Sequence, residues 1–150
     1  MSATDRNLTA AHAEVKTEIA RTDTKTGLLL AFIGAVLAGA WTVAKDMPLN
    51  LPAYIVGGFG MVLLVAAAGL LLRSVRPNLR GRHGFPLWAT LTAEEITATL
   101  AEVDLSADIA GLSRLAVAKF TGLRRAIDLT CGGGALLALA AVIAVVGGAA

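Results

Sequence analysis

The residues best suited to bind a ligand in this sequence are basic and lie in its middle and last thirds. They form two groups: Arg73, Arg76, Arg80 and Arg82, then Lys119, Arg124 and Arg125. The planar guanidinium fork donates two parallel hydrogen bonds to phosphate oxygens, and an ammonium adds a point charge. The sequence therefore predicts a phosphate-binding ligand site with five candidate residues: Arg73, Arg76, Arg80, Lys119 and Arg124.

The same basic residues have a second interpretation as an anchor. Arginines that directly follow an apolar stretch hold the chain at the membrane surface and can contact anionic lipid headgroups. Both interpretations stay open from the residues alone. A nucleic-acid polymer is not expected as a partner, because 13 Lys and Arg are nearly balanced by 11 Asp and Glu and only 5% of residues are aromatic.

Enzymatic motifs are absent from the sequence. It contains no His-Glu-x-x-His, no phosphate-binding Gly-x-x-x-x-Gly-Lys-Ser/Thr loop and no nucleophile elbow. His12 and His83 are far apart and have no acidic cluster beside them, and Cys131 is the only cysteine. We therefore expect a protein that is not an enzyme and that holds neither a metal ion nor a cofactor.

The chain is 56% hydrophobic, and the excess is concentrated in three long windows without any charged residue or histidine. They are Gly27–Ala44, Ala53–Leu72 and Leu129–Ala150. A membrane-spanning helix needs about 20 mostly apolar residues, and all three windows meet that length. The last window, rich in Gly and Ala, has the alternative of a buried core helix. The composition predicts an all-α membrane protein with three transmembrane helices and cytoplasmic amphipathic helices.

Basic residues set the expected orientation. Four Lys and Arg precede Gly27, one lies in the loop 45–52, and eight lie between Arg73 and Asp128. Because cytoplasmic segments carry the excess of Lys and Arg, the N-terminus and the middle segment are predicted inside and the loop outside. A cleavable signal peptide is not expected, since many charges precede the first apolar window. The predicted segments are 1–26, the hairpin 27–72, the cytoplasmic segment 73–128 and the last span 129–150.

Outside the windows, apolar spacing and capping residues predict helices. Leu8, Val15, Ile19 and Thr26 share one helical face, so residues 1–26 should form an amphipathic helix that packs on the middle segment or on lipid and runs into the first span. Thr92 and Glu95 have the spacing of a capping box, and a helix follows them.

The middle segment also predicts a loop and a long helix. Pro77, Gly81, Gly84 and Pro86 exclude regular helix around them. Asp104 is expected to cap a helix that flows into the last span. The apolar face of that helix is predicted to consist of Leu105, Ile109, Leu112, Ala116, Phe120, Leu123 and Ile127.

Small residues recur along the windows at helix-packing spacing. Because small side chains let helices approach closely in lipid, five residues are predicted to pack spans together: Gly34, Ala38, Gly39, Gly57 and Gly58. Packing within one chain and self-association of several chains are both open.

Short motifs at the ends of the windows resemble the transmembrane effectors of bacterial Pycsar anti-phage defence. They are Arg21-Thr-Asp23-Thr-Lys25-Thr-Gly-Leu-Leu-Leu, Leu-Leu-Arg73-Ser-Val-Arg76-Pro77-Asn-Leu, and the helix from Leu112 to Ile127 with Lys119 and Arg124. The similarity covers nearly the whole chain. No dedicated cyclic-nucleotide-binding domain accompanies it.

The resemblance implies a function in the bacterial inner membrane. A partner cyclase would make a cyclic pyrimidine mononucleotide, cyclic UMP or cyclic CMP, and the effector would respond by impairing the membrane. It implies a multi-pass homo-oligomer with its N-terminus in the cytoplasm. Two other classes remain as alternatives: a non-enzymatic membrane scaffold or subunit, and a holin-like protein that permeabilises membranes without a ligand.

Overall fold

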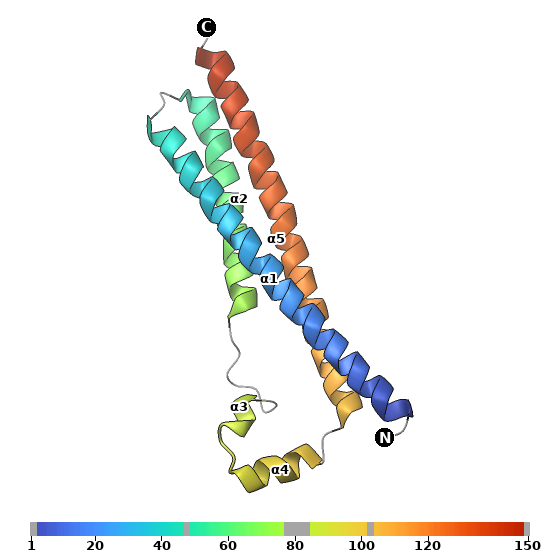
Figure 1. Cartoon of the computed structure of the whole chain (residues 1–150). Helices are drawn as coiled ribbons and strands as arrows, with labels where there is room; N and C mark the ends of the chain where they lie inside the picture. The colour runs from blue at the N-terminus through green and yellow to red at the C-terminus, as the bar shows by residue number, and fades with distance from the viewer. Residues whose placement is uncertain (1–2, 47–48, 77–84, 102–103, 149–150) are drawn as a thin grey trace. The chain divides into compact units, whose positions relative to one another are not determined.

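The chain folds into helices joined by short connections (Figure 1). The computed structural model describes residues 3–46, 49–76, 85–101 and 104–148. The helices are α1 (Ala3–Asp46), α2 (Leu51–Val75), α3 (Phe85–Trp88), α4 (Ala93–Ala101) and α5 (Leu105–Gly148). Over these described ranges there is no strand, which confirms the all-α prediction.

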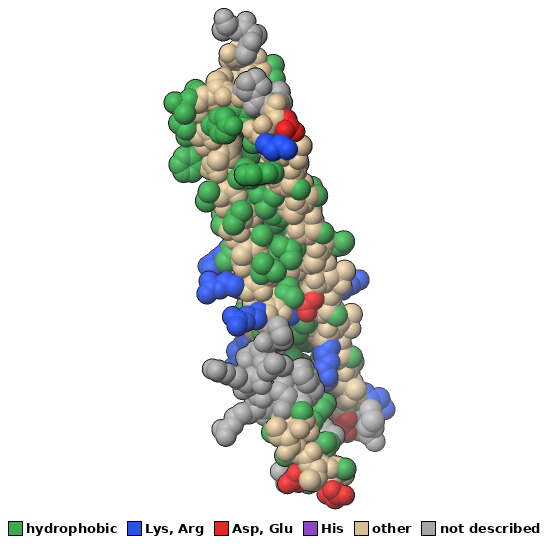
Figure 2. Space-filling model, turned by 90° about the vertical axis from the view of Figure 1, so that its left-hand side faces the viewer, with side chains coloured by type: hydrophobic (Ala, Val, Ile, Leu, Met, Phe, Trp, Pro, Cys, Tyr) green, Lys and Arg blue, Asp and Glu red, His purple; other side chains and the backbone are tan. Residues whose placement is uncertain are grey.

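Three of the helices are long and apolar enough to cross a membrane. Each of them contains an apolar stretch of 18 residues. The mean hydropathy of that stretch is 2.1 in α1, 2.5 in α2 and 2.3 in α5. Most of these apolar side chains point outward, as Figure 2 shows, and Phe32, Val62 and Val145 are each more than half exposed. So large an apolar surface suits hydrocarbon rather than water. The three predicted spans are therefore confirmed as span-capable helices.

The helices contribute to two compact units. The polar unit comprises residues 1–20 and 76–118, and the span unit comprises residues 21–75 and 119–150. α1 and α5 are unbroken helices of 44 residues that each begin in the polar unit and end in the span unit. From Ala3 onward the N-terminal helix continues into the first span without a break, as predicted, and the middle helix continues from Leu105 into the last span.

A seven-residue repeat of shielded positions runs along both long helices. On α1 these buried or half-buried residues are Leu8, Val15, Thr22, Leu29 and Val36, with His12, Ile19, Thr26, Ile33 and Ala40. On α5 they are Leu105, Leu112, Lys119, Ala126, Gly133 and Ala140, with Ile109, Ala116, Leu123, Thr130, Leu137 and Ala144. Such a repeat keeps one seam of each helix against its neighbours, as in left-handed helix packing.

The predicted apolar face of α5 is wrong at two positions. Phe120 is 38% exposed and Ile127 is 43% exposed, and the seam instead contains Lys119 and Ala126. Assigning the face from apolar side chains alone leads from Ala116 to Phe120, the next apolar residue at helical spacing. The packed helix keeps the seven-residue repeat and places a lysine in the seam, because its aliphatic stem can be buried while its ammonium finds a partner.

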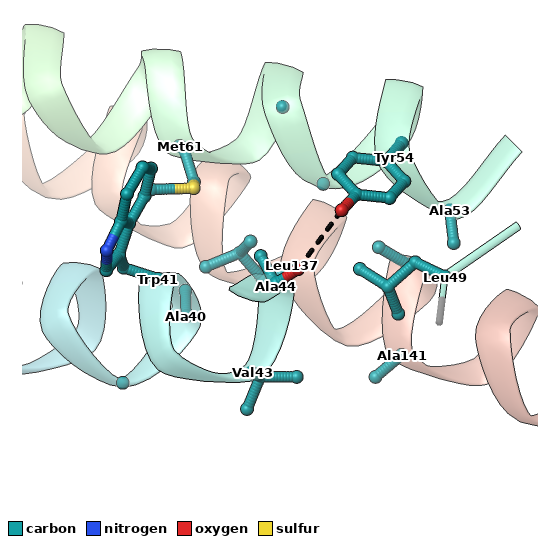
Figure 3. A pocket seen from close by; sticks show the side chains of 14 residues that line it. Ala40, Trp41, Val43, Ala44, Leu49, Ala53, Tyr54, Met61, Leu137 and Ala141 are labelled. Carbon is teal, nitrogen blue, oxygen red and sulfur yellow. Dashed lines mark hydrogen bonds between the residues drawn. The ribbon is translucent and has the colours of Figure 1, made fainter. Parts of the chain in front are cut away.

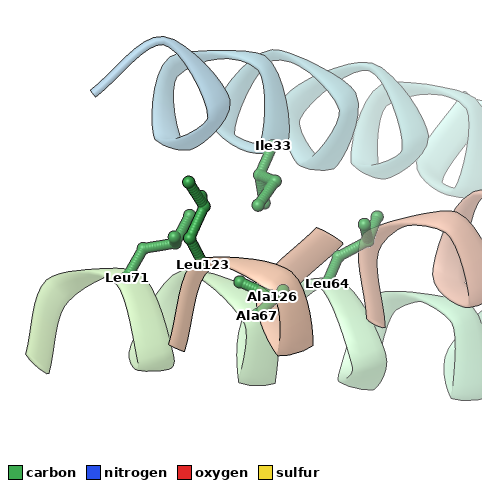
Figure 4. Close-up of a cluster of buried hydrophobic side chains, with 6 residues drawn as sticks. All are labelled: Ile33, Leu64, Ala67, Leu71, Leu123 and Ala126. Atoms are coloured by element: carbon green, nitrogen blue, oxygen red, sulfur yellow. The ribbon is translucent and has the colours of Figure 1, made fainter. Parts of the chain in front are cut away.

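The core of the span unit lies between α1, α2 and α5. Its buried side chains are Ile33 from α1, Leu64, Ala67 and Leu71 from α2, and Leu123 and Ala126 from α5 (Figure 4). The two alanines let the helices approach, and the larger side chains fill the space on either side. All three helices therefore share one packed layer.

Both predicted helix caps are present. Thr92 N–H donates to Glu95 Oε2 at 2.8 Å and Glu95 N–H donates to Thr92 Oγ1 at 3.3 Å, which is the predicted capping box before α4. Asp104 Oδ1 accepts from the backbone N–H of Ser106 at 3.0 Å and of Ala107 at 3.3 Å. These bonds satisfy N–H groups that the first turns of α4 and α5 leave without an intrahelical acceptor.

The cap at Asp104 predicts a loss of order at the start of α5 in acid. The Ser106 hydroxyl, then the Ala107 and Ser106 amides, hold the pKa of Asp104 below its ordinary value of 3.8. The stabilisation is therefore present above the unfolded pKa and is lost as pH falls through the lower folded pKa. We expect the Ser106 and Ala107 amide NMR shifts to move as the pH falls below the reference carboxyl value of about 4. Asp104→Asn, which caps without titrating, should abolish this step, and an unchanged step in that variant would contradict the assignment.

The connection between the first two spans is shorter than the predicted loop 45–52. Lys45 and Asp46 still belong to α1, and Leu51 and Pro52 already belong to α2. Asn50 accepts a hydrogen bond on Oδ1 from Ala53 N–H at 3.0 Å and donates from Nδ2 to the Ile143 carbonyl oxygen at 3.2 Å. One side chain thus caps α2 and ties the connection to α5.

Substitutions at Asn50 should separate these two roles. Asn50→Asp keeps the acceptor for Ala53 but loses the donor to Ile143, whereas Asn50→Ala loses both. We expect Asn50→Ala to lower the free energy of unfolding in detergent by about 1–2 kcal/mol, the usual effect of removing a cap, and Asn50→Asp to lower it less. Equal stability of the alanine variant and the wild type would contradict the role of the cap.

The prediction that Pro77–Pro86 excludes regular helix is wrong at its end. Residues 77–84 lie outside the described residues, as do Arg80, Arg82 and His83. Pro86 is the second residue of the short helix α3. The first turn of a helix has no intrahelical acceptors for its N–H groups, so a proline there removes no hydrogen bond.

Candidate functional site

The predicted ligand residues differ in their surroundings. Arg73 in the last turn of α2 and Arg124 on α5 are exposed residues of the span unit, and Arg76, just after α2, is also exposed. Arg80 lies outside the described residues. Lys119 is different, because only 17% of its side chain is exposed. Figure 2 shows Lys and Arg gathered below the apolar surface of the spans.

Lys119 is held by an acidic partner on α1. Its Nζ lies 2.6 Å from Oδ1 and 2.8 Å from Oδ2 of Asp23, so the ammonium donates to both carboxylate oxygens. The Asp23 side chain is 44% exposed. This pair occupies the seam between α1 and α5, where an ionic contact fixes the register of two helices. Lys119 therefore carries a positioning contact, whereas Arg73, Arg76 and Arg124 of the predicted set are exposed.

Two buried threonines adjoin Asp23 on α1. Thr22 and Thr26 are 2% and 1% exposed, and Thr26 Oγ1 donates to the Thr22 carbonyl oxygen at 2.8 Å. Bonding back to the preceding turn satisfies a hydroxyl without a partner helix. The seam of the span unit thus contains the polar residues Thr22 and Thr26 on α1 and Lys119 and Thr130 on α5.

The polar unit contains a second contact between α1 and α5. His12 Nε2 lies 2.8 Å from Asp108 Oδ2, and 19% of the His12 side chain is exposed. The two residues are 96 positions apart, and so are Asp23 and Lys119. Each unit therefore has its own side-chain contact between α1 and α5. Neither pair was predicted from the sequence, because the partners in each pair lie 96 positions apart.

The predicted packing residues fall into two groups. Gly57 on α2 faces Ala140 of α5, where an added Cβ would lie 3.4 Å from the Ala140 Cβ. An added Cβ at Gly34, Gly39 or Gly58 would meet nothing within 4 Å, and Ala38 is exposed. Within one chain, the closest approach of α2 and α5 is instead at Gly60 and Gly133, where a Cβ on either glycine would lie under 3 Å from the other's carbonyl oxygen.

The described residues offer little to a metal ion. Among them no three His, Cys, Asp or Glu side chains lie close enough together to hold one. Cys131 is an exposed free thiol on α5.

Comparisons with known proteins agree with this arrangement. A family model for the Pycsar effector protein domain matches residues 7–147, which include α2, α3 and α4 and nearly all of α1 and α5. No curated protein and no solved structure matches the chain. Since the family match covers almost the whole sequence and the three span-capable helices fit it, the chain belongs to the Pycsar effector protein family.

Proposed function

We propose that this protein is a non-enzymatic effector that impairs the bacterial inner membrane when a cyclic pyrimidine mononucleotide, cyclic UMP or cyclic CMP, binds its cytoplasmic part. A partner cyclase would make the nucleotide. The N-terminus and the polar unit would lie in the cytoplasm, as the excess of Lys and Arg before the first span and after the second favours. Family membership supports the defence role.

The observation that carries the proposal is the continuity of α1 and α5. Each helix takes part in the polar unit and in the span unit without a break. A ligand that binds one arrangement of their polar ends more tightly shifts the population toward the matching arrangement of their apolar ends. The exposed arginines Arg73 and Arg124, both in the span unit, would supply donors for the single phosphate of the nucleotide.

Dye release from vesicles tests this function. The purified full chain is reconstituted in phosphatidylethanolamine and phosphatidylglycerol vesicles that enclose a dye, with nucleotide on both sides. We expect release with cyclic UMP or cyclic CMP and none with cyclic AMP. Arg124→Gln should raise the nucleotide concentration required, whereas Lys45→Gln, at the other end of the first span, should not.

The other outcomes identify the alternatives. Release that is equal with and without nucleotide would contradict ligand control and favour the holin-like class. Absence of release under every condition, with stable co-purification of another membrane protein, would favour the scaffold class.

We also propose that the spans assemble into a homo-oligomer. Gly34 leaves open space on α1, so the backbone of a second copy can approach there. Cys131 is the only cysteine in the chain and is exposed, so its cross-linking in vesicles measures the association. Gly34→Leu is expected to reduce the cross-linked fraction, and an unchanged fraction would contradict this surface.

A further inference from the structure

The span unit contains an apolar cavity of about 350 Å³ at the end where α1 connects to α2 (Figure 3). All three long helices line it. Small residues create the space, among them Gly39 and Ala40 on α1, Gly57 and Gly58 on α2, and Ala140 on α5. Its volume lies within the range of about 300–1,000 Å³ that is usual for small-ligand sites.

The lining of the cavity is apolar and therefore suits a hydrocarbon ligand. Tyr54 carries the phenolic hydroxyl of the lining, and it already donates to the Ala44 carbonyl oxygen at 3.1 Å. The other lining side chains are aliphatic, apart from Trp41 and Met61, or are glycines. Water needs two or more polar partners to occupy such a site, so it has no favourable position here. An empty cavity would leave the lining without dispersion contacts.

The bilayer around the span unit contains hydrocarbon chains that could enter the cavity. Trp41 and Tyr54 lie toward opposite ends of it and are 65% and 51% exposed, so the cavity communicates with the medium around the helices (Figure 3). For span-capable helices that medium is the interior of a bilayer, and aromatic pairs of this kind are typical of its boundary. Hydrocarbon chains are therefore present at high concentration beside the opening.

We propose that this cavity binds one acyl chain of a membrane lipid between α1, α2 and α5. The chain contacts Met61 and Leu137, which are half-buried, from inside the span unit. Binding of the acyl chain requires neither the nucleotide nor the proposed defence function.

Photolabelling tests the site. The full chain is reconstituted in phosphatidylethanolamine and phosphatidylglycerol vesicles that contain a phosphatidylcholine with a diazirine on one acyl chain, and labelled residues are mapped by mass spectrometry. We expect labelling at Met61 and Leu137 in addition to the outward residues Phe59 and Val62, both of which are 64% exposed. Labelling confined to Phe59 and Val62 would overturn the proposal.

Two matched variants of α2 separate the cavity from general lipid contact. An added Cβ at Gly58 or at Gly69 would meet nothing within 4 Å, and Gly58 lines the cavity whereas Gly69 does not. Gly58→Leu is expected to reduce labelling of Met61 and Leu137 at least fivefold, and Gly69→Leu should leave it unchanged. Equal labelling in the two variants would overturn the site. If Met61 is not labelled in the wild type and Gly58→Leu loses the dimer cross-linked through Cys131, a second copy of the chain occupies the cavity and the proposal is overturned.

Discussion

Replacing Gly133 with alanine is expected to push α5 away from α2 and to lower the free energy of unfolding by about 1–3 kcal/mol, the usual effect of overpacking. A Cβ at Gly133 would lie 2.8 Å from the Gly60 carbonyl oxygen and 2.9 Å from the Leu64 Cγ. The carbonyl belongs to the backbone of a helix, so it cannot move aside alone. Gly60→Ala should have a similar effect, since its Cβ would lie 2.9 Å from the Gly133 carbonyl oxygen.

The neighbouring residue Gly134 provides the control. An added Cβ there would meet nothing within 4 Å. Both substitutions gain the same helix propensity, up to about 1 kcal/mol for Gly to Ala, so their difference isolates the clash. Unfolding of the reconstituted chain in mixed micelles measures that difference. Equal stabilities of Gly133→Ala and Gly134→Ala would show that α2 and α5 do not approach at this point.

The parts of the fold that are local in sequence were predictable. Charge-free windows indicate spans because lipid excludes ionised groups over the whole length of a helix. The caps at Thr92 and Asp104 were equally accessible, since each depends on residues within three positions of one another. These features need no knowledge of which helix packs against which.

The contacts between helices were less predictable. Gly60 and Gly133 each belong to a run of small residues, and only the packed structure selects them from neighbours such as Gly58 and Gly134. Similarly, the spacing of apolar residues predicted Phe120 on the packed face of α5, although Lys119 occupies that position. A charged residue enters a seam when its partner lies on another helix, and that partner was 96 residues away.

Lys119 and Asp23 therefore provide the second large expected effect. Lys119→Met keeps the apolar stem and removes the ammonium, which leaves the Asp23 carboxylate without this partner. We expect a loss of about 1–3 kcal/mol in the free energy of unfolding, the range for a hydrogen bond to a charged group. Asp23→Asn should be destabilising for the complementary reason, because the Lys119 side chain is only 17% exposed and its ammonium loses the carboxylate charge and one of its two acceptor oxygens.

A variant in which Asp23 and Lys119 exchange places distinguishes a direct contact between the two side chains from two independent roles. If the ammonium and carboxylate act on each other, the double variant Asp23→Lys with Lys119→Asp should recover much of the stability lost by either single charge reversal. The coupling energy should fall within about 0.5–3 kcal/mol, as for residues in contact. Lys25→Met, an exposed lysine of the same helix, should change stability by at most about 0.5 kcal/mol. Additive losses in the exchanged pair would mean that this ion pair does not fix the register of α1 and α5.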